Sequence, residues 1–125
     1  MWKISKRELT LSDQAGLLAV LTAVANVQRM RVVAELTGGR VHVSELARRL
    51  GMSRPLLYMH LDRLEKAGLV AGQLELSEDG KAMKYYALVP FDIRVSAETI
   101  TEAVRQAGGE PADGSADQAD GPLDQ

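Results

Sequence analysis

The chain of 125 residues contains no cysteine and few aromatic side chains, which make up 4% of it. The absence of cysteine excludes disulfide bonds, thiolate metal ligands and cysteine nucleophiles. Hydrophobic residues still make up 46% of the sequence, so we expect a globular core built mainly from aliphatic side chains. A chain of this length is sufficient for one domain with a modest core.

Long apolar runs are absent as well. No run approaches the roughly 20 residues that a membrane-spanning helix needs. Basic residues near the amino terminus precede the apolar segment 15–25 and superficially match a secretory signal. However, Glu8 and Asp13 interrupt the basic region, and the apolar segment leads directly into the predicted domain. We therefore expect a cytoplasmic protein that does not bind a membrane.

Basic charge is missing from segment 108–125. This segment has no lysine or arginine, and its five acids are Glu110, Asp113, Asp117, Asp120 and Asp124. Residues 1–107 therefore hold 12 acids against 15 bases, a mildly basic balance that permits DNA binding without requiring it. The Gly, Pro, Asp and Ala content of the segment predicts a disordered acidic tail, with an autoinhibitory or DNA-mimicking tail as the alternative.

Segment 43–70 has the pattern of two short helices joined by a tight turn. We expect Ser44 to cap the first helix and Ser53 to cap the second. Gly51 suits the left-handed position that ends the first helix. The apolar residues that recur at helical spacing are Leu46, Ala47, Leu50, Leu57, Leu61 and Leu64. This arrangement predicts a helix-turn-helix, whose second helix usually enters the major groove of DNA.

Two further helices are predicted before the helix-turn-helix. The first covers about residues 12–25, with Ser12 as its N-cap. The second begins after Asn26 and extends through Leu36. From the helical period we expect its inward residues to be Met30, Val33 and Ala34. Its arginines, Arg29 and Arg31, are expected to face mainly outward.

Strands and a last helix are predicted after the helix-turn-helix. Residues 69–76 and 81–88 have the pattern of antiparallel strands joined by the turn 77–80. An extended segment over 91–95 and a final helix over 96–106, capped by Ser96, complete the pattern. A helix-turn-helix followed by a β-hairpin is a winged helix. We therefore predict a mainly α protein with a small β-hairpin, in the α+β class.

The first predicted helix is apolar over more than one face, which a small domain rarely buries alone. A second copy of the chain would cover the extra face, although a central helix wrapped by its own domain is the alternative. The expected dimer interface combines the N- and C-terminal helices and consists of Leu17, Leu18, Leu21, Val24, Ile100 and Val104. The predicted organisation is an N-terminal arm (1–11), the winged helix-turn-helix domain (12–107) and the acidic tail (108–125).

The order of these elements and their residues resembles the ArsR-like winged-helix repressors. The resemblance covers about residues 23–88, and its most specific parts are ANVQRMRVVAEL (25–36), VSELARRLGMS (43–53), HLDRLEKAGLV (60–70) and GKAMKYYAL (80–88). It implies a transcriptional repressor that forms a homodimer through its first and last helices. Such a dimer is expected to bind double-stranded DNA at an inverted-repeat promoter site. A small-molecule effector is left open.

The outward face of the second helix of the motif departs from the family pattern. Family members usually place small polar and basic residues where this chain has Pro55, Tyr58 and Met59. Tyr58 and Met59 would either contact DNA or pack under the wing. Arg54 and Arg63 are the best candidates for base or phosphate contacts. The remaining expected contacts neutralise phosphates and come from Arg40, Arg48, Arg49, Lys81 and Lys84.

Metal sensing and catalysis are not expected, and no cofactor is predicted. Metal-responsive relatives use cysteines, or histidine and carboxylates on the last helix, whereas the only histidines here are His42 and His60. We expect His60 to be a hydrogen-bonded structural residue. The sequence has no glycine-rich phosphate loop after a strand and no nucleophile–base spacing. The alternative function is a protein-interaction module that binds its partner through Leu56, Tyr58 and Met59.

Overall fold

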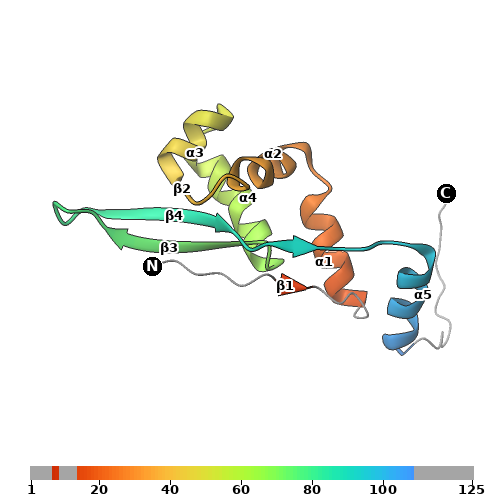
Figure 1. The fold of residues 1–125 in the computed structure, drawn as a ribbon. Coiled ribbons are helices and arrows are strands. Elements are labelled where there is room, and N and C mark those ends of the chain that lie inside the picture. The colour runs from red at the N-terminus through yellow and green to blue at the C-terminus, as the bar shows by residue number, and fades with distance from the viewer. Residues whose placement is uncertain (1–6, 9–13, 109–125) are drawn as a thin grey trace. The chain divides into compact units, whose positions relative to one another are not determined.

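The computed structural model describes residues 7–8 and 14–108, in which helices predominate (Figure 1). The helices are α1 (Gln14–Val24), α2 (Val27–Leu36), α3 (Val43–Leu50), α4 (Arg54–Lys66) and α5 (Ala97–Gln106). The strands are β1 (Arg7–Glu8), β2 (Val41–His42), β3 (Val70–Leu76), β4 (Ala82–Leu88) and β5 (Phe91–Asp92). These elements confirm the predicted α+β class. Ser12 and nearly all of the predicted arm and tail lie outside the described residues.

The chain forms two compact units. Among the described residues, the larger unit contains residues 7–8 and 18–92, and the smaller contains residues 14–17 and 93–108. The larger unit therefore holds the complete helix-turn-helix and the hairpin that follows it. The smaller unit holds α5 and the first residues of α1.

The core of the larger unit is aliphatic, as the scarcity of aromatic residues predicts. Its largest fully buried side chains are Val32, Leu36, Leu46, Leu57, Leu61, Leu64 and Leu69. One of these residues lies in α3, three lie in α4, and Leu69 directly precedes strand β3. The inward face predicted for the helix-turn-helix is therefore confirmed. Gly51 ends α3 with φ 64°, the left-handed conformation that glycine adopts without steric cost.

The side of α2 that faces the core differs from the prediction. Its buried residues are Val32 and Leu36, whereas none of the three residues predicted to face inward is buried: Met30, Val33 and Ala34. Arg29 lies three positions before Val32 and shares its side of the helix. The prediction was wrong because the guanidinium of Arg29 turns toward the carbonyls of Ala23 and Thr22 at the end of α1, so the side of α2 that carries Arg29 and Val32 faces inward.

The predicted helix caps are confirmed at three positions and wrong at one. Asn26, Ser53 and Ser96 each accept a hydrogen bond from a backbone N–H three residues later, as N-caps do. Ser44 does not cap α3, because strand β2 runs directly into that helix and His42 becomes the N-cap residue without a side-chain hydrogen bond. Ser44 lies inside the helix and contacts the next helix instead.

The second part of the larger unit is a three-stranded sheet with the order β2-β4-β3 and antiparallel pairing throughout. Strands β3 and β4 form the wing, a hairpin that extends beyond the helices (Figure 1). The predicted turn at 77–80 is present, with Gly80 at φ 82° and the N–H of Ser77 donating to the carbonyl of Lys81 at 2.8 Å. The predicted extended segment after the wing forms β5, which pairs in parallel with β1.

Helices α1 and α2 follow each other closely and are bent by 90° at their junction. Together they reach the length and hydropathy of a membrane span, but the bend separates them into two short helices. No single helix in the described ranges is long and apolar enough to cross a membrane.

The smaller unit is built around α5. Ser96 and Thr99 form a reciprocal capping box at its start. The hydroxyl oxygen of each residue accepts a hydrogen bond from the backbone N–H of the other. Ala103 is buried, whereas Ile100 and Val104 are each 45% exposed. Within the described residues, Ile100 and Val104 thus form an apolar stripe on α5 that is partly exposed.

Candidate nucleic-acid interface

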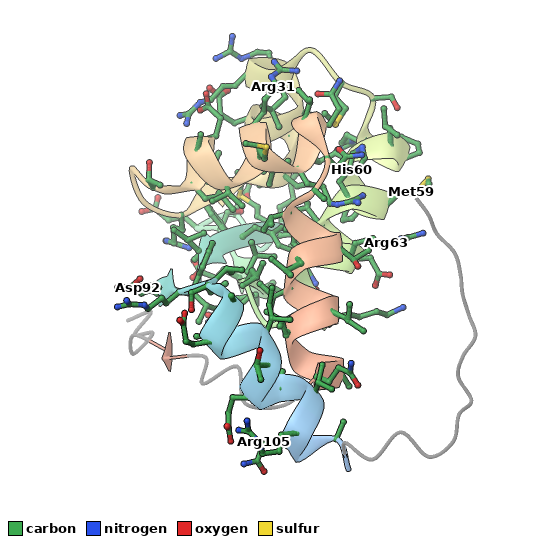
Figure 2. All side chains as sticks on the ribbon, turned by 90° about the vertical axis from the view of Figure 1, so that its right-hand side faces the viewer. Arg31, Met59, His60, Arg63, Asp92 and Arg105 are labelled. Carbon is green, nitrogen blue, oxygen red and sulfur yellow. The ribbon has the colours of Figure 1, made fainter. Side chains whose placement is uncertain are left out.

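Helix α4 presents its outer face to solvent. We define this face as Arg54, Leu56, Tyr58, Met59 and Arg63. Leu56 is 40% exposed, Tyr58 41% and Met59 63%. Figure 2 shows Met59 and Arg63 projecting away from the rest of the larger unit.

The two arginines of this outer face keep most of their donors available. Arg54 donates one hydrogen bond from Nη1 to the Ser44 hydroxyl at 2.8 Å, which links the start of α4 to α3. A guanidinium carries five N–H donors. Within the described residues, neither Arg54 nor Arg63 has a carboxylate within salt-bridge distance. Both are therefore able to bind an anionic or hydrogen-bonding partner.

The two arginines of α3 share one carboxylate. Arg48 donates from Nε to Glu45 at 3.0 Å, and Arg49 donates from Nε to the same carboxylate at 2.9 Å. These hydrogen bonds, that from Arg48 first, lower the pKa of Glu45 to about 2. Arg49 also lies 3.6 Å from Glu35. The positive charge predicted here for DNA phosphates is thus partly neutralised within the protein.

The cations near the wing fall on different faces of the sheet. Lys84 and Tyr85 are neighbours on β4, so their side chains point to opposite faces. The guanidinium of Arg40 lies 4.0 Å from the centroid of the Tyr85 ring and is ion-paired with Glu75 at 2.7 Å. Lys81, next to the turn, is exposed. The structure therefore places Arg40 on the opposite face from Lys84.

Tyr86 and Gly72 join the wing to α4, and neither was among the predicted site residues. The rings of Tyr58 and Tyr86 meet edge to face, with centroids 6.4 Å apart, so Tyr58 partly packs under the wing. Tyr86 is 5% exposed, and burial, followed by the nearby Glu65, raises its pKa to about 12. A Cβ on Gly72 would lie 2.8 Å from Cε2 of Tyr86. The one sequence signal that could have identified this close contact is the position of Gly72 inside a predicted strand.

His60 is confirmed as a hydrogen-bonded structural residue. Its Nδ1 lies 3.2 Å from Nη1 of Arg29, and burial, followed by the charges of Arg29 and Arg63, lowers its pKa. Because an arginine can only donate, this contact makes Nδ1 the acceptor of a neutral imidazole. Among residues 7–8 and 14–108, no group of three histidine or carboxylate side chains is placed to hold a metal ion.

Comparison with known proteins gives the same assignment as the geometry. Residues 25–73 match the helix-turn-helix domain family. The HTH-type transcriptional regulator MJ0229 of Methanocaldococcus jannaschii is 35% identical over 78 residues, which cover 62% of this chain and 81% of the relative.

Two solved structures share the fold. Reduced HlyU from Vibrio cholerae N16961 is 26% identical, with a TM-score of 0.52 over 75% of this chain and 90% of that one. The homodimeric winged helix-turn-helix DNA-binding domain Mb0332 from Mycobacterium bovis, described as a possible ArsR-family transcriptional regulator, is 21% identical. Its TM-score is 0.52 over 78% of this chain and 82% of that one, a likeness of fold.

The helix-turn-helix, its wing and these relatives define the class. The chain belongs to the helix-turn-helix transcriptional regulators. Its fold is the winged form found in HlyU and in Mb0332, a possible ArsR-family regulator.

Proposed function

We propose that this chain is a homodimeric repressor that binds an inverted-repeat promoter site through α4 and the wing. The observation that carries the proposal is the outer face of α4, where Arg54 and Arg63 are exposed on a helix-turn-helix of the regulator family. In this motif the second helix lies in the major groove and its first residues reach the base edges. Arg54, the first residue of α4, is then the side chain with the most direct access to a guanine.

Phosphate contacts would come from the residues around this helix. Arg48 on α3 has an exposed side chain, and Lys81 and Lys84 lie on the wing. Such contacts orient a protein on the duplex without reading its sequence. Arg40, Arg48 and Arg49 are all ion-paired in the free protein, so their use on DNA would require exchanging a carboxylate for a phosphate.

Homodimerisation is supported by apolar residues that one chain leaves exposed. Leu18 on α1 is 56% exposed, and Ile100 and Val104 on α5 are each 45% exposed. Leu21 and Val24 are partly exposed, whereas Leu17 is already buried within the chain. The neighbour Mb0332 is homodimeric. We therefore propose that α1 and α5 form the dimer interface.

The proposed regulator acts on chromosomal DNA in the cytoplasm and does not use a metal ion as its signal. The lack of cysteine removes thiolate ligands, and α5 carries Glu98 and Glu102 but no histidine. The effector is left open in the proposal.

A protein-interaction module is the second candidate function. The observation that favours it is the apolar character of the α4 outer face, where Leu56, Tyr58 and Met59 are all at least 40% exposed. On DNA these groups would have to meet thymine methyls or sugar, since none of them matches the bidentate contact of an arginine with guanine.

Binding to tiled fragments of the DNA upstream of the gene separates the two functions. Fluorescence anisotropy of each labelled fragment is measured while the salt concentration is raised. The repressor proposal predicts tight binding of one or a few fragments, with log K falling by about 0.9 for each neutralised phosphate per decade of salt. Absence of binding to every fragment at low salt would favour the interaction module. Equal binding to unrelated fragments would indicate an architectural protein with little specificity.

A further inference from the structure

The end of helix α1 has an unusual set of hydrogen-bond donors. The last four carbonyls of an α-helix have no partner inside the helix. Here the N–H of Ala25 binds the carbonyl of Leu21, and the N–H of Asn26 binds that of Val24. The other two carbonyls, of Thr22 and Ala23, accept hydrogen bonds from a side chain of the next helix.

That side chain is Arg29 of α2. Its Nε donates to the carbonyl of Ala23 at 2.6 Å, and its Nη2 donates to that of Thr22 at 3.4 Å. The positive guanidinium also lies at the negative end of the α1 dipole, where a cation is stabilised. The backbone of Arg29 is held at the start of α2, because its N–H donates to the N-cap side chain of Asn26 at 3.0 Å. The side chain itself is held by its hydrogen bonds to the end of α1.

The third nitrogen of the same guanidinium reaches α4. Nη1 of Arg29 lies 3.2 Å from Nδ1 of His60, so one planar group connects the end of α1, the start of α2 and the middle of α4. Figure 2 shows His60 on the side of α4 nearest α1, while Met59 and Arg63 point away from it. His60 is thus adjacent in sequence to the outer face but contributes nothing to it directly.

We propose that Arg29 is the positioning residue that fixes the orientation of α4 against the end of α1, and thereby the half-site spacing accepted by the dimer. This inference rests on the proposed function, in which α1 joins the two subunits and α4 enters the major groove. In a two-fold dimer the direction of α4 relative to the dimer helix determines how far apart the two α4 helices lie. That separation has to match one turn of DNA, or a multiple of it, between half-sites.

The test measures the DNA affinity of the native protein and of Arg29→Met. The DNA is the upstream fragment that the native protein binds most tightly, with zero, one or two base pairs inserted at the centre of the fragment. In the native protein, one inserted base pair should lower the affinity by about tenfold, because it rotates and displaces one half-site. In Arg29→Met the ratio of the affinity without an insertion to the affinity with one inserted base pair should fall toward one, because α4 can change its orientation to meet the displaced half-site. A variant that binds all fragments more weakly but keeps the native ratio would contradict the proposal, because only the stability would have changed.

Three other variants control the experiment. His60→Leu removes the acceptor and should reduce the ratio as Arg29→Met does, whereas His60→Gln retains an acceptor and should preserve it. Arg31→Met removes a similar link, from α2 to the carbonyl of Leu50 on α3, and should leave the ratio unchanged. Arg29→Lys keeps the charge with a single donor group and provides an intermediate case if Arg29→Met does not fold.

A measurement without DNA keeps this inference separate from the proposed function. Because the chain lacks cysteine, spin labels can be attached at Ala19→Cys on α1 and Lys66→Cys on α4, both exposed in the larger unit. In labelled protein diluted with unlabelled chain, Arg29→Met should broaden the distance distribution between the labels and Arg31→Met should not. An unchanged distribution would overturn the positioning role even if DNA binding is confirmed. A broadened distance distribution in Arg29→Met would support the positioning role of Arg29 even if the protein binds no DNA fragment.

Discussion

Tyr86 of the wing packs its ring against the edge of Tyr58 on α4, with the two planes 68° apart, and the backbone of Gly72 passes close enough to leave no room for a side chain. This contact connects the hairpin to the helix that carries Arg54 and Arg63. Edge-to-face aromatic pairs contribute about 0.5–1.5 kcal/mol beyond their buried area. The wing is therefore a packed extension of the helix-turn-helix.

Replacing Gly72 with alanine should destabilise the protein. The added Cβ would lie 2.8 Å from Tyr86, so the ring or strand β3 has to move. Such overpacking typically costs about 1–3 kcal/mol, measurable by urea denaturation. Gly38→Ala provides the control, because nothing lies within 4 Å of a Cβ at that position. Equal urea midpoints for Gly72→Ala and Gly38→Ala would show that the contact between Gly72 and Tyr86 does not limit stability.

Glu45→Gln should strengthen DNA binding. The carboxylate of Glu45 binds both Arg48 and Arg49 in the free protein. Its removal makes the Arg48 guanidinium available to a phosphate, whereas Arg49 keeps its ion pair with Glu35. Affinity for the selected fragment should rise, and the slope of log K against log salt should steepen by about 1. A salt slope unchanged in Glu45→Gln would remove α3 from the proposed interface.

Stability should fall as the pH drops below about 6.5, because the folded protein keeps His60 neutral. The pKa of His60 is lowered in the folded state, so the unfolded chain binds a proton more readily. The stability that is present above the ordinary histidine pKa of 6.5 is then lost as the pH falls through the lower pKa of the folded state. Urea denaturation across this pH range should show the loss in the native protein and a smaller one in His60→Gln. The same loss in both proteins would assign it to other groups.

Leu57→Ala and Met59→Ala test how α4 divides into an inner and an outer face. Leu57 is 0% exposed, and its truncation should lower the free energy of unfolding by about 2–5 kcal/mol. Met59 is 63% exposed, and its truncation should change stability by no more than about 0.5 kcal/mol. Similar losses in both variants would contradict the placement of the helix.

The helix-turn-helix could be predicted from the sequence because its signals are local. The leucine spacing of α4, Gly51 and the N-cap at Ser53 each depend on neighbouring residues, and all three are found as expected. The cap at Ser44 failed because the pairing of β2 with β4 determines where α3 begins. A strand of two residues paired with a segment far along the chain leaves no local pattern.

The side-chain contacts between separate helices and strands could not be predicted either, because their partners are far apart in the sequence. Arg29 was expected to face solvent, since the acceptors at the end of α1 and on His60 come together only in the folded chain. Likewise, Tyr86 lies opposite Gly72 through the register of the wing. The ion pairs of three candidate phosphate contacts, Arg40 with Glu75 and Arg48 and Arg49 with Glu45, likewise form between side chains that only the folded structure places together.

The outer face of α4 is proposed to bind DNA, and the double variant Arg54→Ala, Arg63→Ala removes both of its arginines. The affinity of this variant for the selected upstream fragment is compared with that of the native protein and of Lys66→Ala, which removes a cation paired with Asp62 on the same helix. We expect the double variant to bind about tenfold more weakly or worse and to discriminate less against unrelated DNA, with little change in Lys66→Ala. Native affinity in the double variant would show that the outer face does not bind DNA.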